Sequence, residues 1–283
     1  MTGVFAYLQF LQTQRTTFDN FISQQVAKAF DEIGNSKIEV RIGGIYTLEG
    51  ALQVNNFYRI PVLQALSAFV RGTANQTTST QLQADVQAAM IVIGRNLTGA
   101  DFLYFQQLYL VRADLVRADL RKANFAGSHL NESNLYGSNL DGANLTGVDL
   151  TGASLDSADL RDAVLRDANL TRASLKFANL IGSNLENANL SGTDLKYSNL
   201  TNAKLNNAKL RGAIIRGAYL RNADLSGADL VGVELVDVDL RGAILNNANL
   251  NGTRISGSSP TSGACGSNVT PPGDLILKPC LVP

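Results

Sequence analysis

A five-residue period dominates the chain and constrains its fold more than any other feature. Every fifth position from 110 to 255 is apolar without a gap, and 27 of these 30 positions are leucine. The position two residues earlier is nearly always small, with 19 alanines and 5 serines among the 30 sites. Asn or Asp stands between the two in most units, as in Ala143-Asn144-Leu145. The repeating unit is therefore A-(N/D)-L-x-x.

Neither an α-helix nor a continuous strand accommodates this period. Five residues advance about 500° on a helix, which spreads the leucines around its axis, and on a strand successive leucines alternate faces. The conflict disappears if each unit is a short extended piece followed by a corner. The second corner position holds Gly at 13 of 29 sites from 112 to 252, and Gly readily adopts positive φ. The sequence therefore predicts a square coil with an apolar lumen.

Four sides per coil predict a second period of 20 residues. The pairs Lys176-Phe177 and Lys196-Tyr197 recur at that spacing, within LKFANL and LKYSNL. Thirty units would make about seven and a half coils, stacked at roughly 4.8 Å. The leucines of one coil gain only several kcal/mol against the entropy of ordering it, so neighbouring coils must stabilise one another.

The segment before the repeats has helical rather than five-residue spacing. We expect helices over residues 17–33, 38–52, 56–70 and 81–93. Such a segment would cover an open coil end, which exposes unpaired backbone groups and leucines. After position 257 the chain is rich in Gly, Ser, Pro and Thr, and this tail could fold over the other end. The predicted domains are a helical domain at 1–95, a coil at 96–257 and an irregular tail at 258–283.

On its A-(N/D)-L-x-x units the chain resembles the pentapeptide repeat family over residues 96–257. The resemblance implies a mainly β fold, a right-handed, four-sided parallel β-helix, which here follows an N-terminal α-helical cap domain. Residues 37–51 (KIEVRIGGIYTLEGA) and 85–95 also resemble a leader of some bacterial members. Those relatives often carry transmembrane helices upstream. We therefore expect a bacterial protein.

Composition excludes several classes of protein. The chain has 24 basic and 24 acidic residues and is 45% hydrophobic, unlike a basic nucleic-acid-coating protein, an acidic disordered chain or a membrane protein. Residues 1–11 are apolar but too few to span a bilayer, which takes about 20 residues. They also lack the basic region and cleavage site of a signal peptide. We expect a cytoplasmic protein, with peripheral membrane attachment through residues 1–11 left open.

Residues for catalysis are scarce. The single histidine, His129, occupies an outward position three residues from Glu132, and no phosphate-binding or dinucleotide-binding glycine motif occurs. We therefore expect no enzyme activity, no cofactor and no metal. The two cysteines, Cys265 and Cys280, lie in the tail. A disulfide between them would close a loop of about 16 residues, whereas free thiols are favoured in a reducing cytosol.

The outward positions give one candidate contact surface. Residues 131–160 contain five acidic and no basic residues, whereas 196–221 contain six basic and no acidic residues. The 20-residue period would stack three cations beside two aromatic rings on one face: Lys176, Lys196 and Arg216 beside Phe177 and Tyr197. Stacked like charges repel and the coil does not require exposed rings, so this face is suited to an anionic partner. The plainer alternative is surface decoration, with lysine stems covering the rings.

Three functions compete. The first is a non-catalytic scaffold that binds a protein partner through the outer faces of the coil, without direct nucleic-acid binding. The second follows from the resemblance, because some relatives mimic duplex DNA, bind DNA gyrase and confer quinolone resistance. Mimicry requires a continuously acidic surface, and residues 97–256 hold 17 acidic and 16 basic residues, which disfavours it. The third is an enzyme. Homodimerisation through the C-terminal coil, as in some relatives, also stays open.

Overall fold

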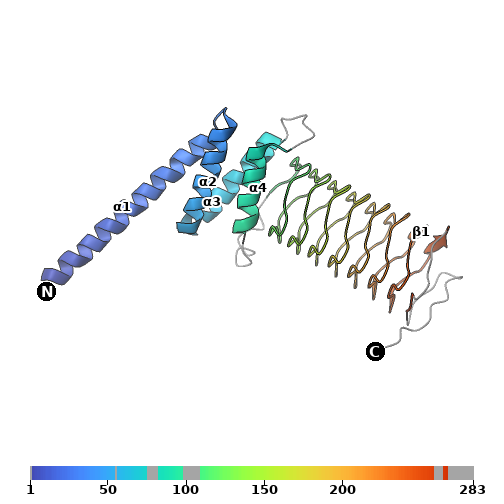
Figure 1. Ribbon diagram of the computed structural model, residues 1–283. Helices are drawn as coiled ribbons and strands as arrows, with labels where there is room; N and C mark the ends of the chain where they lie inside the picture. Colours follow the sequence, from blue (N-terminus) through green and yellow to red (C-terminus); the bar gives the residue numbers. More distant parts are fainter. Residues whose placement is uncertain (1, 55, 75–81, 98–108, 258–263, 267–283) are drawn as a thin grey trace.

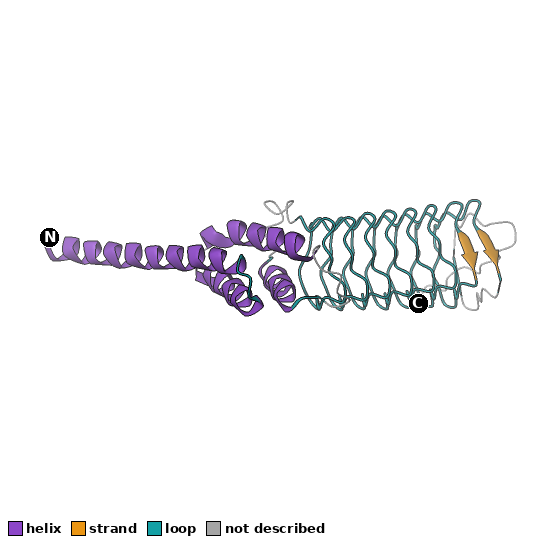
Figure 2. Cartoon of the chain, turned by 90° about the horizontal axis from the view of Figure 1, so that it is seen from above, coloured by secondary structure: helices purple, strands orange, loops and turns teal. Residues whose placement is uncertain are grey.

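The chain forms a group of helices followed by a long coil (Figures 1 and 2). The computed structural model describes residues 2–54, 56–74, 82–97, 109–257 and 264–266. The described N-terminal part contains the helices α1 (Thr2–Ile33), α2 (Ile38–Val54), η1 (Asn56–Tyr58), α3 (Arg59–Ala74) and α4 (Ala84–Asn96). None of these helices, over the residues described, is long and apolar enough to cross a bilayer.

The helical predictions are confirmed with one difference in length. The helices expected at 38–52, 56–70 and 81–93 end within a few residues of α2, of η1 with α3, and of α4. The helix expected at 17–33, however, begins at Thr2. Apolar spacing reports only residues that pack against a core, and residues 9–21 of α1 are exposed. The first half of α1 therefore carried no periodic signal.

Two close contacts hold the helices together. α1 crosses α2 at Gly44, where a Cβ atom would lie 2.8 Å from the Cβ atom of Glu32 and 2.9 Å from the carbonyl oxygen of Ala29. α2 is joined to α4 by an ion pair in which Arg41 Nε lies 2.6 Å from Asp85 Oδ2. Asp85 is fully buried, so Arg41 compensates a charge that would otherwise be costly to bury.

The coil repeats every 20 residues, as predicted. Parallel bridges join residues 20 apart, from Tyr109 and His129 to Asp229 and Asn249, and one bridge occurs in every five-residue unit. Each coil therefore has four paired sides. Within the described residues, longer strands are limited to β1 (Glu234–Val236) and β2 (Arg254–Ser256), which pair in parallel. Single-residue bridges prevail because a corner follows each side after two or three residues.

The corners have the predicted backbone conformation. Every fifth residue from 112 to 257 has a positive φ, between 53° and 74°. Sixteen of these residues are not glycine, and many are Asn or Asp, the side chains that tolerate this region best after Gly. The corner is therefore imposed by the coil, and Gly is its least strained occupant.

The lumen is filled by the leucines and by the small residues two positions earlier. The leucine position is at most 3% exposed from 110 to 250. Serines in the small position satisfy their hydroxyls locally: Ser133, for example, donates to the carbonyl of Leu130 at 2.7 Å. The lumen is therefore a dry core whose residues cannot contact a partner.

Helix α4 lies over the first coil and pairs with its backbone. The amide side chain of Gln87 acts as a strand would, donating to the carbonyl of Asp119 and accepting from its N–H, both at 2.8 Å. The N–H of Asn124 donates to the carbonyl of Gly94 at 3.0 Å. A Cβ atom at Gly94 would lie 2.7 Å from the Cβ atom of Ala123. α4 therefore satisfies backbone groups that an open coil end leaves unpaired.

The C-terminal predictions fall largely outside the described residues. Residues 258–263 and 267–283, including Cys280, are among those not described, so the disulfide stays a prediction. Cys265 bridges Ile244 in parallel, an offset of 21 rather than 20 residues. The domain limits 1–95, 96–257 and 258–283 likewise stay predictions.

The contact of Gly94 with the coil predicts an asymmetric response to a methyl group. Gly94→Ala should be less stable than Gly50→Ala by about 1–3 kcal/mol, because the added methyl meets Ala123. Gly50 is the matched control, since it lies in α2 with no atom within 4 Å of an added Cβ. Urea unfolding of both variants measures the difference. Equal stabilities would show that α4 does not press on the coil.

Candidate functional site

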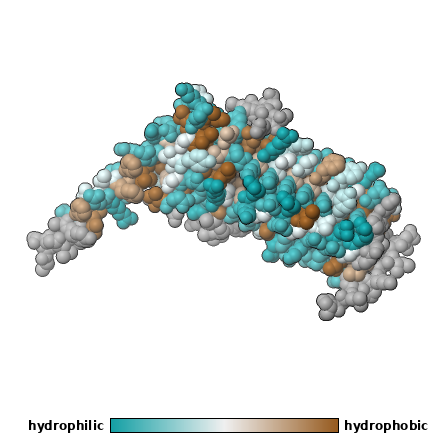
Figure 3. All heavy atoms as spheres, viewed as in Figure 1, coloured by the Kyte–Doolittle hydropathy of each residue, from teal (hydrophilic) through white to brown (hydrophobic). Residues whose placement is uncertain are grey.

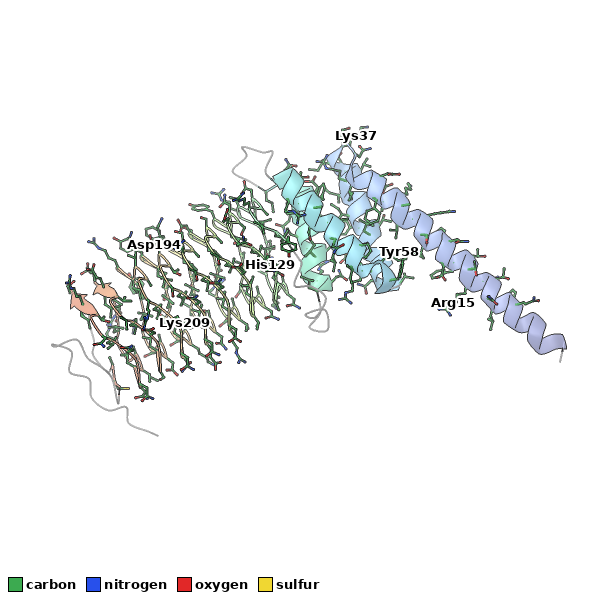
Figure 4. The ribbon with its side chains drawn as sticks, turned by 180° about the vertical axis from the view of Figure 1, so that it is seen from behind. Arg15, Lys37, Tyr58, His129, Asp194 and Lys209 are labelled. Carbon is green, nitrogen blue, oxygen red and sulfur yellow. The ribbon has the colours of Figure 1, made fainter. Side chains whose placement is uncertain are left out.

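The structure stacks the predicted contact residues along one side of the coil. Bridges join Ser174 to Asp194 and Asp194 to Ile214, so the residues two positions later, Lys176, Lys196 and Arg216, follow one another coil by coil. The next residues, Phe177 and Tyr197, stack with ring centroids 5.1 Å apart and planes 13° from parallel. Figure 4 shows Asp194 on this outer surface. We call Lys176, Phe177, Lys196, Tyr197 and Arg216 the aromatic face.

The lysines of this face are compensated, which the sequence did not indicate. Lys176 Nζ lies 3.5 Å from Asp156 Oδ2 and 3.9 Å from Asp194 Oδ2, and Lys196 Nζ lies 3.3 Å from the same Asp194 oxygen. The expected repulsion between the stacked lysines is therefore relieved by the carboxylate between them. Arg216 is exposed and takes part in none of these ion pairs. The face is weakly rather than strongly basic.

The two rings lie flat on the coil. A Cβ atom at Gly217 would come within 2.6 Å of two ring carbons of Tyr197, so Gly217 provides the space in which that ring rests. Phe177 covers the preceding coil and stays 62% exposed, and Tyr197 is 46% exposed. The stack therefore presents its edges and the outer face of Phe177 to solvent.

Both rings occupy corners that disfavour them. Phe177 and Tyr197 have φ of 59° and 57°, and they are the only aromatic residues among the corner positions from 112 to 257. The left-handed conformation costs a bulky residue roughly 1–2 kcal/mol. A stacked aromatic pair contributes about 0.5–1.5 kcal/mol. The coil therefore gains little from these rings that Gly would not provide.

Two further apolar residues extend the face and were missed from the sequence. Ile214 is 44% exposed and bridges Asp194, and Tyr219 is 50% exposed on the next side of the coil. Both occupy the outward position at which Asn or Asp is usual. Their departure from A-(N/D)-L was a signal, but we treated that position as polar throughout. Elsewhere the visible face of the coil is mostly hydrophilic (Figure 3).

Other charges on the coil are tied up in pairs two residues apart. In three Asp-Leu-Arg units the guanidinium donates to the carboxylate, and these hydrogen bonds hold the pKa of each Asp below its ordinary value of 3.8. Nδ1 or Nε geometry is not involved, because Arg pairs through Nε and a terminal nitrogen, as Arg121 does with Asp119 at 2.8 and 2.7 Å. The pairs are Asp119 with Arg121, Asp159 with Arg161, and Asp239 with Arg241. These cations are therefore less available to a partner than Arg216.

His129 lies near the end of the coil that faces the helices (Figure 4). Its ring stacks on Tyr109 with centroids 4.9 Å apart, and its Nδ1 atom is 3.9 Å from Asp149 Oδ2. Over the described ranges, no three His, Cys, Asp or Glu residues form a group that could hold a metal ion. His129 therefore has surface contacts that account for its position.

Comparisons with known proteins agree with the repeat. A family model described as pentapeptide repeats, with eight copies, matches residues 113–152, 149–187, 173–212, 203–242 and 218–257. A comparison with curated proteins gave no match.

Among solved structures, HetL of the cyanobacterium Nostoc sp. strain PCC 7120, involved in heterocyst differentiation regulation, is 28% identical over 55% of this chain and 81% of its own, with a TM-score of 0.25. A pentapeptide repeat protein of the Arabidopsis thaliana thylakoid lumen is 38% identical over 35% of this chain and 65% of its own, with a TM-score of 0.27. QnrB1, a plasmid-mediated fluoroquinolone resistance protein, is 17% identical over 55% of this chain and 89% of its own, with a TM-score of 0.31. Because the family model covers residues 113–257, about half of the chain, the protein belongs to the pentapeptide repeat family.

Proposed function

We propose that this protein is a non-catalytic scaffold that binds a protein partner through the aromatic face. The observation that carries the proposal is the stack of Phe177 on Tyr197 at corners with positive φ. Exposed rings held in an unfavourable backbone conformation are not explained by the stability of the coil. A contact with another molecule explains them.

The chemistry of the face indicates the kind of partner. The rings offer apolar and stacking contact, while Arg216 offers a cation that can pair with a carboxylate. Since Asp156 and Asp194 compensate the lysines, the rings contribute more to recognition than net charge does. The partner we propose is a protein segment with an apolar or aromatic contact residue next to an acidic one.

The architecture favours this role. A rigid coil presents its outer residues in a fixed register, so binding costs little conformational entropy. The proposal includes a right-handed coil, a helical domain at 1–95 that caps it, a coil at 96–257, a tail at 258–283 and a location in the bacterial cytoplasm. Catalysis has no part in it, because the outer faces hold ion pairs and single polar residues rather than an activated nucleophile.

Binding should depend on the rings. The double variant Phe177→Gly with Tyr197→Gly should lose the partners that affinity capture recovers from a lysate of the source cells. The matched control is Asn187→Gly with Asn207→Gly, which changes corner residues of the same φ on another side. The control should keep those partners. An unchanged partner list in the aromatic variant would refute the proposal.

Stability should not depend on the rings. Gly relieves the strain of the left-handed conformation but loses the stack and raises the entropy of the unfolded chain, so the double variant should stay within about 1 kcal/mol of the original. Leu195→Ala, which removes a lumen side chain, should lose about 2–5 kcal/mol. Urea unfolding compares the three proteins. A loss in the aromatic variant as large as that of Leu195→Ala would make the rings structural.

A further inference from the structure

Helix α1 extends far beyond the helices that pack against it (Figures 1 and 2). The hydroxyls of Ser23 and Tyr58 hydrogen-bond at 2.6 Å, and N-terminal to this contact residues 9–21 are all exposed. Figure 4 shows Tyr58 beside α1 and Arg15 on the free part of the helix. The first half of α1 therefore has no cover from the described part of its own chain.

This free half carries an apolar stripe. Phe10, Leu11, Phe18 and Phe21 are 57%, 44%, 51% and 54% exposed. At 100° per residue, Leu11 and Phe18 lie within about 20° of Ala29, which is fully buried in the helical core. The stripe therefore continues the face with which α1 packs against its neighbours.

A free helix of this composition is poorly stabilised in water. Arg15 and Asp19 are the only charged residues between positions 2 and 27, so the free half lacks a series of i,i+4 ion pairs. Helices in proteins gain most of their stability from packing of an apolar face. The exposed stripe thus indicates that another surface covers α1.

We propose that this surface is α1 of a second copy, packed antiparallel. An antiparallel pair centred on Thr17 places Arg15 of each copy opposite Asp19 of the other, because the two positions are equally far from the centre. Both residues lie on one flank of the stripe, about 60° and 100° from Phe18, and an antiparallel pair brings like flanks together. A parallel pair would set this flank against a neutral one. The charges of α1 are therefore self-complementary in the antiparallel arrangement alone.

A lipid surface fits α1 less well. Helices that lie in a membrane interface are rich in Lys and Arg on the polar face. α1 has one arginine in its free half, balanced by Asp19. We therefore assign the stripe to protein contact and treat lipid binding as an outcome of the test.

The experiment measures the mass of the full-length protein by light scattering across a concentration series. The original chain should dimerise. Arg15→Asp and Asp19→Arg should each weaken the dimer about tenfold or more, because each places like charges opposite one another twice. An equimolar mixture of the two variants should recover it as a heterodimer, and the double swap in one chain should recover the homodimer.

Controls separate pairing from folding. Circular dichroism should show equal helix content for the variants at matched oligomeric state. Lys28→Asp, a charge change at an exposed site of α1 with no charged residue opposite, should leave the dimer unchanged. A monomeric original chain, or a mixture that does not recover the dimer, would overturn the proposal. So would flotation of a monomeric chain with phosphatidylcholine vesicles, which would assign the stripe to lipid.

Discussion

The pairing of each residue with the one 20 positions later is the constraint on which the rest of the structure depends. On one side of the backbone this pairing stacks Leu175 under Leu195, and on the other it stacks Ser174 under Asp194. The N–H groups of Asp194 and Leu195 donate to opposite neighbouring coils, to Ala173 and Ile214, so each coil depends on both of its neighbours. A single register thus fixes the core and the order of residues on the surface.

The parts of the structure that follow from this register were predictable from the sequence, and the others were not. Leu and Gly recur because the lumen and the corners demand them, so the period, the coil and the stacking of Phe177 near Tyr197 were readable. The outward position obeys no such demand. The bridging of the lysines by Asp194 depends on rotamers, and the exposure of Ile214 breaks the rule we applied. The length of α1 was missed for a related reason, because its free half packs against nothing in the described chain.

The same division separates stability from function. The lumen accepts little variation, whereas the outer faces vary without harm to the core, so departures from the repeat are the most informative residues. Strained rings at Phe177 and Tyr197 and an uncovered stripe on α1 are two such departures, at different places along the chain. The first supports a partner-binding face, and the second supports self-association. A paired molecule would then carry two copies of the aromatic face, which raises the effective affinity for a repeated partner.

The most direct test of the register is a pair of cysteine cross-links in a chain carrying Cys265→Ser and Cys280→Ser. Asn179→Cys with Asn199→Cys places two outward thiols at bridged positions, where strands about 4.8 Å apart suit a disulfide. Asn179→Cys with Asp194→Cys shifts the second thiol by one side of the coil. Mass spectrometry of the folded, mildly oxidised monomers should find the cross-link at an offset of 20 residues and free thiols at 15. Equal cross-linking of the two pairs, or cross-linking at 15 alone, would contradict the coil.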